Sequence, residues 1–169
     1  MNTNLQTISA KIYQNIVDFE TNLNVWRLSK ETIVFTNGCF DLLHLGHIDY
    51  LSKAADLGTK LIIGLNSDLS TQNLKGPNRP ICNQTSRAAL LASLFFVDAV
   101  ILFDEPTPIT LISTILPQVL VKGADYEIEN IVGAKEVIAN KGEVKTITFL
   151  PGYSTTAIEQ KIINSISKF

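Results

Sequence analysis

The stretch IVFTNGCFDLLHLGH, residues 33–47, decides the fold class. It begins with a short apolar run at residues 33–35 and passes into the turn-forming pair Asn37-Gly38, which is typical of a buried strand that ends in a loop. The His-x-Gly-His motif at residues 44–47 follows, and His47–Leu57 then has the apolar spacing of a helix. A buried strand that leads through a loop into a helix predicts a unit of a parallel α/β sheet.

The same unit recurs along the chain. Further apolar runs predict strands at residues 61–65, 97–102, 119–121 and 144–150. Helical spacing is found at residues 85–95, 108–116, 134–140 and from Thr156 onward. One amphipathic N-terminal helix is predicted by the spacing of Ile8, Ile12, Ile16, Phe19 and Leu23. Together these elements predict a doubly wound, Rossmann-like α/β domain, with a five-stranded parallel sheet covered by helices on both faces. We expect a helical extension at residues 1–30 and the α/β domain at residues 31–169.

The composition restricts the class of protein. A chain of 169 residues with 46% hydrophobic and 18% charged residues is one globular domain and not a disordered chain. The net charge of −2 argues against binding to nucleic acid or to an anionic membrane. Two cysteines, Cys39 and Cys82, are too few for a disulfide framework. The chain has neither signal-peptide features nor an apolar stretch long enough to span a membrane, so we expect a cytoplasmic protein.

The His-x-Gly-His motif lies where a doubly wound sheet binds its ligands, beyond the carboxyl end of a strand. Neither the G-x-G-x-x-G fingerprint nor a P-loop is present. His44 and His47 are three residues apart and lie on one side of a helical turn. A helix N-terminus favours an anion, and Gly46, which lacks a Cβ, permits a close approach to the backbone. The pattern indicates stabilisation of phosphate charge during phosphoryl or nucleotidyl transfer.

Three other interpretations of these residues are open. Zinc would bind His44 and His47 with a third ligand from Cys39, Asp41 or Cys82. Alternatively, Cys39 would be a nucleophile with one histidine as its base. In the third interpretation both histidines pack in the core and have no chemical role. Their position at the carboxyl end of a strand, beside two glycines, argues against this last interpretation.

Two motifs resemble those of a known superfamily. Residues 36–41 followed by His44-Leu45-Gly46-His47 resemble the H-x-G-H nucleotidyltransferases, and Ser154-Thr155-Thr156 matches their Ser/Thr-rich motif at the start of the last helix. More narrowly, the chain is similar to the adenylyltransferase domain of the bifunctional heptose enzymes. That similarity lies in the segments 35–41, 61–68, 74–80, 121–126 and 133–137.

The resemblance implies a nucleotidyltransferase domain at residues 31–169 that transfers AMP from ATP to D-glycero-β-D-manno-heptose 1-phosphate. The products would be pyrophosphate and ADP-heptose, a precursor of the lipopolysaccharide core. Mg²⁺ is expected with the triphosphate. A separate kinase would supply the heptose phosphate, because no sugar-kinase domain precedes this one. We further expect a homodimer, in which apolar side chains of the N-terminal helix cover a second copy.

The resemblance also assigns roles to single residues. It gives catalysis to His44, His47, Lys75 and Arg79. It gives nucleotide binding to Thr36, Asn37, Gly38, Cys39, Phe40, His44, Gly46, His47, Arg87, Lys122, Gly123, Asp125, Ser154, Thr155 and Thr156. Binding of the acceptor substrate falls to Asp41, Asn66, Asp68, Lys75 and Arg79. No residue is assigned to a metal, and no general base is needed because a sugar phosphate is already ionised.

Simpler structural roles compete with several of these assignments. For Asp41 we favour a role in which the carboxylate accepts backbone N–H groups and holds its loop. The other candidates for a structural role are Phe40 as a core aromatic, Asn66 and Asp68 as turn or cap residues, Arg87 as a surface ion pair, and Thr156 with Glu159 as a capping box.

Two other functions compete with adenylyl transfer. One is a cytidylyltransferase for a polyol or amino-alcohol phosphate such as glycerol 3-phosphate. Glycerol-phosphate cytidylyltransferases have Arg-Thr-Glu-Gly-Ile before Ser-Thr-Thr, whereas this chain has Leu150-Pro151-Gly152-Tyr153, which counts against CTP. The other is a silent nucleotide-binding module, against which both histidines and the Ser/Thr motif argue because the chain retains them.

Overall fold

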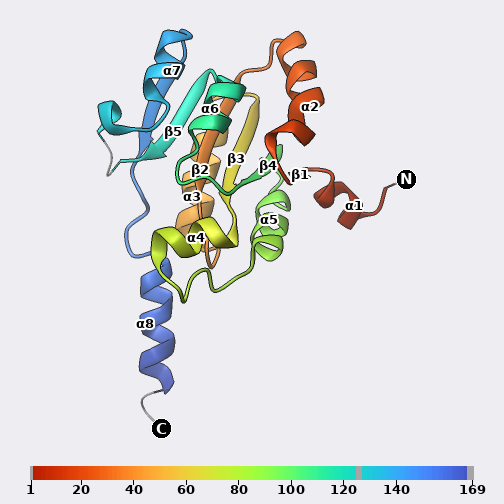
Figure 1. Ribbon diagram of the computed structural model, residues 1–169. Helices are drawn as coiled ribbons and strands as arrows, with labels where there is room; N and C mark the ends of the chain where they lie inside the picture. The colour runs from red at the N-terminus through yellow and green to blue at the C-terminus, as the bar shows by residue number, and fades with distance from the viewer. Residues whose placement is uncertain (1, 125–126, 167–169) are drawn as a thin grey trace.

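The computed structural model contains one entirely parallel sheet with six strands, where the apolar runs predicted five (Figure 1). It describes residues 2–124 and 127–166. The strand order is β1-β4-β3-β2-β5-β6. The strands are β1 (Ile12–Tyr13), β2 (Ile33–Gly38), β3 (Lys60–Asn66), β4 (Ala99–Phe103), β5 (Val119–Gly123) and β6 (Glu143–Ile147). The helices are α1 (Asn4–Ser9), α2 (Ile16–Leu28), α3 (Leu45–Ala55), α4 (Asp68–Lys75), α5 (Gln84–Ala92), α6 (Ile109–Ile115), η1 (Ile128–Asn130), α7 (Ala134–Ala139) and α8 (Thr155–Ile166).

The additional strand is β1, so the prediction of one continuous N-terminal helix is wrong. Ile12 and Tyr13 pair with Val100 and Ile101 on the outer edge of β4. Helix α2 then begins after Asn15, whose side chain accepts a free backbone N–H group in the first turn of that helix. The edge of β4 offers backbone partners that a helix of the same sequence would not satisfy. The segment predicted as a helical extension therefore contributes a strand and a covering helix to the domain.

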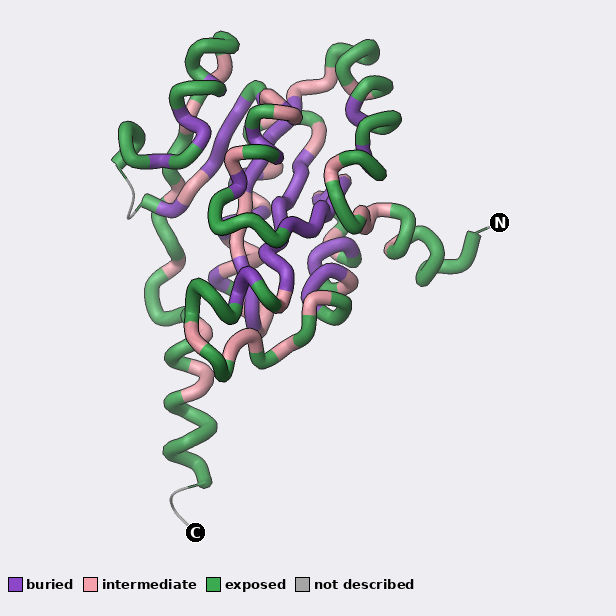
Figure 2. The backbone as a smooth tube through the Cα atoms, in the orientation of Figure 1, coloured by how far each residue is buried: buried purple, intermediate pink, exposed green. Residues whose placement is uncertain are grey.

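Both faces of the sheet are buried, as the apolar runs predicted. Helices α2, α6 and α7 contribute to the core on one face, and α3 and α5 contribute to the core on the other. Along β2, Ile33 and Phe35 point into the first core and Val34 into the second. Figure 2 shows the buried backbone concentrated in the strands and on the inner sides of the helices. Each large apolar side chain buried in this way contributes about 1.5–3 kcal/mol.

The topology places a crevice at the carboxyl edge of the sheet. The chain passes from β2 outward to β3 and β4, and then returns to β5 on the other side of β2. Connections that leave β2 and β5 in opposite directions open a space for ligands beyond the ends of these strands.

The sequence prediction missed α4, which lies at this edge and begins where Ser67 accepts the backbone N–H of Ser70 at 3.1 Å. In the described part of the chain, no helix is long and apolar enough to cross a membrane.

Two glycines with positive φ allow the strain of a left-handed backbone to be separated from overpacking. Gly133 has a φ of +85°, and a Cβ at this position would lie 2.5 Å from Cγ2 of Ile112, whereas Gly152 has a φ of +84° and an open surrounding. We expect Gly152→Ala to lower the free energy of unfolding by about 1 kcal/mol, because only the left-handed backbone is strained. Gly133→Ala should lower it by about 2–4 kcal/mol, since overpacking is added. Urea unfolding of both variants checks this, and equal losses would contradict it.

Candidate active site

A pocket of about 430 Å³ opens at the carboxyl edge of the sheet. It is lined by Asn37, Gly38, Cys39, Phe40, His47, Tyr50, Asn66, Leu74, Lys75, Lys122, Gly123 and Phe149. These residues come from β2 and the loop after it, from α3, from the end of β3, from α4, from β5 and from the segment after β6. Its size is in the range of small-molecule sites. The pocket therefore gathers most of the segments that the motifs singled out.

The two histidines lie against each other at the start of α3. His44 is the N-cap residue, and its ring stacks on that of His47 with centroids 3.8 Å apart and planes 17° apart. The edge of Phe40 contacts the His47 ring, with centroids 5.4 Å apart. Nδ1 of each imidazole is buried and has no hydrogen-bond partner among the described residues. Buried polar atoms without partners at a helix N-terminus indicate a place for a polar ligand.

Both histidines are neutral at neutral pH. Burial is the main reason that the pKa of His47 is lowered to about 4; the nearby His44 and Lys75 act in the same direction, against a smaller opposite effect of Asp41. Burial also lowers the pKa of His44. A bound polyphosphate would reverse this balance, because an anion beside an imidazole favours its protonated form.

The depressed pKa of His47 predicts a pH-dependent stability. Below pH 6.5 the unfolded chain protonates this histidine while the folded chain does not until about pH 4. The free energy of unfolding should therefore fall as the pH falls through this window. We expect the fall to be shallower in His47→Gln, which removes the titrating group. Urea unfolding of both proteins at a series of pH values, without nucleotide, checks this, and parallel curves would contradict it.

The loop of residues 39–44, called here the histidine loop, is strained and is held in place by Asp41. Phe40 and Leu42 have φ values of 47° and 51°, a left-handed conformation that costs about 1–2 kcal/mol per residue. The buried Asp41 carboxylate accepts the backbone N–H groups of Ile81 at 2.8 Å and Cys82 at 3.0 Å. Burial would raise the pKa of this carboxyl, but these hydrogen bonds and Arg79 outweigh it and lower the pKa. Asp41 thus holds the loop, and it does not line the pocket.

The structure requires a glycine at position 46 for a different reason from the one predicted. A Cβ at this position would lie 3.0 Å from Cβ of Tyr153 and 3.1 Å from the ring of His44. The space that the missing side chain leaves is therefore occupied by the protein itself. Gly46 permits Tyr153 and His44 to pack against the first turn of α3, and the close approach that we expected of a ligand is made by these side chains.

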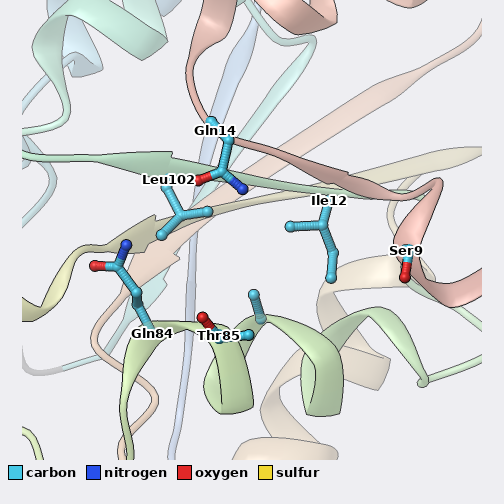
Figure 3. Close-up of a pocket in the computed structure, with 7 residues that line it drawn as sticks. Ser9, Ile12, Gln14, Gln84, Thr85 and Leu102 are labelled. Carbon is cyan, nitrogen blue, oxygen red and sulfur yellow. The ribbon is translucent and has the colours of Figure 1, made fainter.

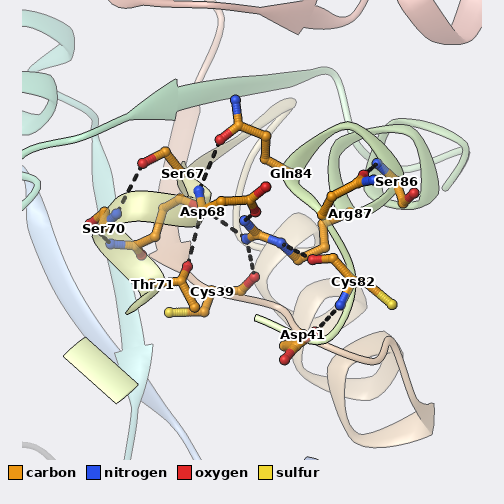
Figure 4. Close-up of polar contacts among 12 residues, drawn as sticks. Cys39, Asp41, Ser67, Asp68, Ser70, Thr71, Cys82, Gln84, Ser86 and Arg87 are labelled. Atoms are coloured by element: carbon orange, nitrogen blue, oxygen red, sulfur yellow. Dashed lines mark hydrogen bonds and ion pairs between the residues drawn. The ribbon is translucent and has the colours of Figure 1, made fainter. Parts of the chain in front are cut away.

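Arg87 is buried among polar partners and does not line the pocket, which corrects both of its predicted roles (Figure 4). Its side chain is 1% exposed. Nη1 donates to the carbonyls of Cys39 at 2.6 Å and Asn66 at 2.8 Å, and Nε donates to the carbonyl of Cys82 at 3.0 Å. Nη2 pairs with the Asp68 carboxylate at 2.7 Å. The guanidinium is neither a phosphate ligand nor a surface ion pair, because its donors are satisfied by four segments of the protein.

Two of the predicted cations line the pocket and a third does not. Lys75 ends α4 at the pocket, is exposed, and forms no hydrogen bond or ion pair within the described residues. Nζ of Lys122 donates to Oδ1 of Asn37 at 2.5 Å. Arg79 is absent from the lining because its guanidinium pairs with Asp41 at 3.3 Å and with Glu159. The structure thus brings Lys75, but not Arg79, together with His47.

The Ser/Thr motif starts α8 beside this site, although its side chains do not line the pocket. Ser154 Oγ accepts the N–H of Ala157 at 3.1 Å, and the Thr155 hydroxyl donates to the carbonyl of Asp41 at 2.8 Å. The predicted capping box between Thr156 and Glu159 is wrong, because Glu159 pairs with the Arg79 guanidinium instead.

Three predicted residues remain: Thr36, Asn66 and Asp125. The hydroxyl of the buried Thr36 pairs with that of Tyr50 at 2.7 Å, so the side chain is used within the protein. Asn66 is buried at the pocket wall, where Nδ2 donates to Ser70 at 3.0 Å. Asp125 lies outside the described residues. Sequence reasoning assigned no role in the site to three lining residues: Tyr50, Leu74 and Phe149.

The alternatives to a phosphate site gain no support from the geometry. In residues 2–124 and 127–166, no three His, Cys, Asp or Glu side chains come together, so zinc has no third ligand there. No hydrogen bond within the same residues joins Cys39 to either histidine, as a nucleophile and its base would require. The histidines are half-buried, and His47 lines the pocket, so they are not core residues.

A smaller pocket of about 220 Å³ lies between α5 and the edge formed by β1 and β4 (Figure 3). It is lined by Ser9, Ile12, Gln14, Gln84, Thr85, Ala88 and Leu102. It shares no lining residue with the larger pocket and contains no charged or imidazole side chain. The smaller pocket lacks groups that stabilise phosphate charge. The larger pocket, which has them, is therefore the candidate active site.

Comparison with known proteins identifies the family of the chain. The sequence model of the cytidylyltransferase-like family matches residues 35–161. The bifunctional protein HldE of Campylobacter fetus subsp. fetus (strain 82-40) is 50% identical over 159 residues, which are 94% of this chain and 34% of that protein. HldE of Photobacterium profundum is 54% identical over 140 residues, which are 83% of this chain and 29% of that protein. The chain spans about a third of the length of the curated relatives it matches.

A solved structure with a similar fold also matches the chain. The lipopolysaccharide core biosynthesis protein from Thermoplasma volcanium GSS1 superposes with a TM-score of 0.57 and 28% identity, over 71% of this chain and 97% of that one. The family match and this fold place the chain among the nucleotidyltransferase enzymes. The chain belongs to the cytidylyltransferase-like family.

The buried guanidinium of Arg87 predicts a large effect on stability. Arg87→Met leaves the carbonyls of Cys39, Asn66 and Cys82 without their donor, so we expect the free energy of unfolding to fall by about 3–5 kcal/mol. Asp68→Asn is the matched control, because that side chain is 40% exposed and asparagine keeps an oxygen that can accept from Nη2, so its loss should be smaller than that of Arg87→Met. Urea unfolding measures both, and similar losses would show that the ion pair, and not the carbonyl contacts, carries the stability.

Proposed function

We propose that this chain is an adenylyltransferase that transfers AMP from ATP to D-glycero-β-D-manno-heptose 1-phosphate and releases ADP-heptose and pyrophosphate. One observation carries the proposal: two stacked, neutral imidazoles with unpartnered Nδ1 atoms lie at the N-terminus of α3, and His47 lines a pocket with Lys75. The relatives named bifunctional protein HldE and the similar structure titled as a lipopolysaccharide core biosynthesis protein support a sugar phosphate as the acceptor.

In the proposed reaction, an oxygen of the acceptor phosphate attacks the α-phosphorus of ATP. A new P–O bond forms, and the bond to the departing pyrophosphate breaks. The attacking oxygen is already ionised, so no residue has to remove a proton. His44, His47 and the N-terminal amides of α3 stabilise the charge that builds up on the phosphates. Lys75 is the cation beside them, because its ammonium is at the pocket and has no partner among the described residues.

The remaining assignments from the family resemblance belong to the same proposal. The nucleoside half of ATP lies against the ends of β2 and β5, through the backbone of residues 36–40 and through Lys122 and Gly123, with Asp125 next to them. Ser154, Thr155 and Thr156 approach the β- and γ-phosphates. Asn66 contacts the acceptor sugar. The proposal includes a cytoplasmic homodimer and a separate kinase that supplies the heptose phosphate.

Mg²⁺ enters the proposal only as part of the nucleotide. The described residues hold no group of three acidic or imidazole side chains, and the carboxylate of Asp41 is already used by two backbone amides and Arg79. These residues do not fit a metal held by the protein. We propose that ATP brings Mg²⁺ with it.

A CTP-dependent cytidylyltransferase is the second candidate, because the family that matches is the cytidylyltransferase-like family. The test is pyrophosphate release with Mg²⁺ and heptose 1β-phosphate, in the presence of either ATP or CTP. Release with ATP alone supports the adenylyltransferase. Release with CTP alone would replace it by the second candidate, and no release with either nucleotide would contradict both for this acceptor.

The histidine pair gives the corresponding mutational prediction. We expect His44→Ala and His47→Ala to lower kcat by about tenfold to a thousandfold, because each removes one group that stabilises the transition state. Circular dichroism and urea unfolding should show that both variants fold. Full activity in a folded variant would remove that histidine from the mechanism.

A further inference from the structure

Among the described residues, the first turns of helix α8 are joined to the domain by two polar contacts. The Thr155 hydroxyl donates to the carbonyl of Asp41 at 2.8 Å, and the Glu159 carboxylate pairs with Nη1 of Arg79. None of the described residues of the helix is buried, and the helix extends away from the sheet (Figure 1). A helix with so little buried surface depends on its few contacts for its position.

Both polar contacts lead to Asp41, one directly and the other through Arg79. Arg79 lies between two carboxylates, and Nη1 is 3.3 Å from Oδ2 of Asp41 and also pairs with Glu159. The side chain of Asp41 is 1% exposed, whereas those of Arg79 and Glu159 are each 22% exposed. Through Arg79, the carboxylate of the histidine loop is therefore joined to α8. The guanidinium also separates two carboxylates that would otherwise repel each other.

The start of α8 also packs directly on the H-x-G-H motif. Cβ of Tyr153, just before the helix, lies against Gly46, where a Cβ would be only 3.0 Å away. A displacement of α8 would therefore move Tyr153 relative to His44 and Gly46. It would also move the Ser154 hydroxyl, which lies next to Tyr153 in the chain.

We propose that Arg79 and Glu159 are a pair of positioning residues, which hold the start of α8 against the histidine loop so that Ser154 and the first amides of α8 reach the nucleotide's phosphates. This inference rests on the proposed function. In this role Arg79 contacts no substrate, which explains why its guanidinium is paired twice and is absent from the pocket lining.

The competing role for Arg79 predicts the opposite effect of one substitution. If Arg79 were a phosphate ligand that Glu159 holds back, Glu159→Gln would free the guanidinium and tighten the binding of ATP. If the two residues position α8, the same substitution loosens the helix and weakens the binding of ATP. The sign of the change in affinity therefore separates the two roles.

The experiment is a double-mutant cycle with Glu159→Gln, Arg79→Met and the double variant. We expect each single variant to raise the KM for ATP by about tenfold, because misplacement of binding groups by a distant change costs on this order or more. We expect kcat to stay within about twofold, since His44, His47 and Lys75 are unchanged. The double variant should be no worse than Arg79→Met, because both substitutions break the same contact between Arg79 and Glu159. An unchanged or lower KM in Glu159→Gln, or additive effects, would overturn the proposal.

A second measurement does not depend on catalysis. Hydrogen exchange of the α8 backbone amides should be faster in Glu159→Gln than in the unaltered chain, whether or not the chain transfers AMP. Lys161→Gln is the matched control, because it removes one charge from an exposed position of the same helix. Equal exchange in the Glu159 variant and the control would overturn the positioning role even if the proposed reaction is found. Faster exchange in a chain that transfers no nucleotide would instead contradict only the proposed function.

Discussion

The buried guanidinium of Arg87 is the interaction on which the site depends. A guanidinium out of contact with water must satisfy its donors within the protein, since a lost partner leaves a buried charge uncompensated. Here the acceptors are the carbonyls of Cys39, Asn66 and Cys82 and the carboxylate of Asp68. These groups belong to the histidine loop, the end of β3, the segment before α5 and the start of α4. The guanidinium is satisfied only when these four segments are in place together, and two of them form walls of the pocket.

The carboxylate of Asp41 adds a second constraint to the same loop. Left-handed conformations at Phe40 and Leu42 are unfavourable for residues with a Cβ, so the loop would not adopt them without compensating contacts. Hydrogen bonds from Ile81 and Cys82 to Asp41 supply such contacts. The left-handed conformations turn the chain so that it enters α3 with His44 at the N-cap. In this way a carboxylate that does not line the pocket determines where the imidazoles lie.

The sequence predicted the order of the main elements because both faces of the sheet are buried, and such strands read as apolar runs. It missed β1 because Ile12 and Tyr13 also fit a helical stripe and two residues are too few to show a strand's alternation. It missed α4 because the two apolar residues of that helix, Leu69 and Leu74, are five residues apart and form no helical stripe. For the candidate site, the H-x-G-H motif predicted His47 and the segment 74–80 predicted Lys75, and both line the pocket. They did not show that Arg87 points inward, because the direction of that side chain depends on four segments that only the fold brings together.

The contrast between the two kinds of buried polar group indicates where the ligand belongs. Asp41 and Arg87 are buried and fully provided with partners, so they have nothing left to offer a substrate. Nδ1 of His44 and His47 is buried without a partner among the described residues, and the pKa of His47 is about 4. The free chain bears the cost of these unsatisfied atoms, and a bound phosphate would relieve it by hydrogen bonding and by favouring a protonated imidazole. Because the stabilisation appears when negative charge arrives, it is greatest where that charge is largest, which is the condition for lowering the barrier to nucleotidyl transfer.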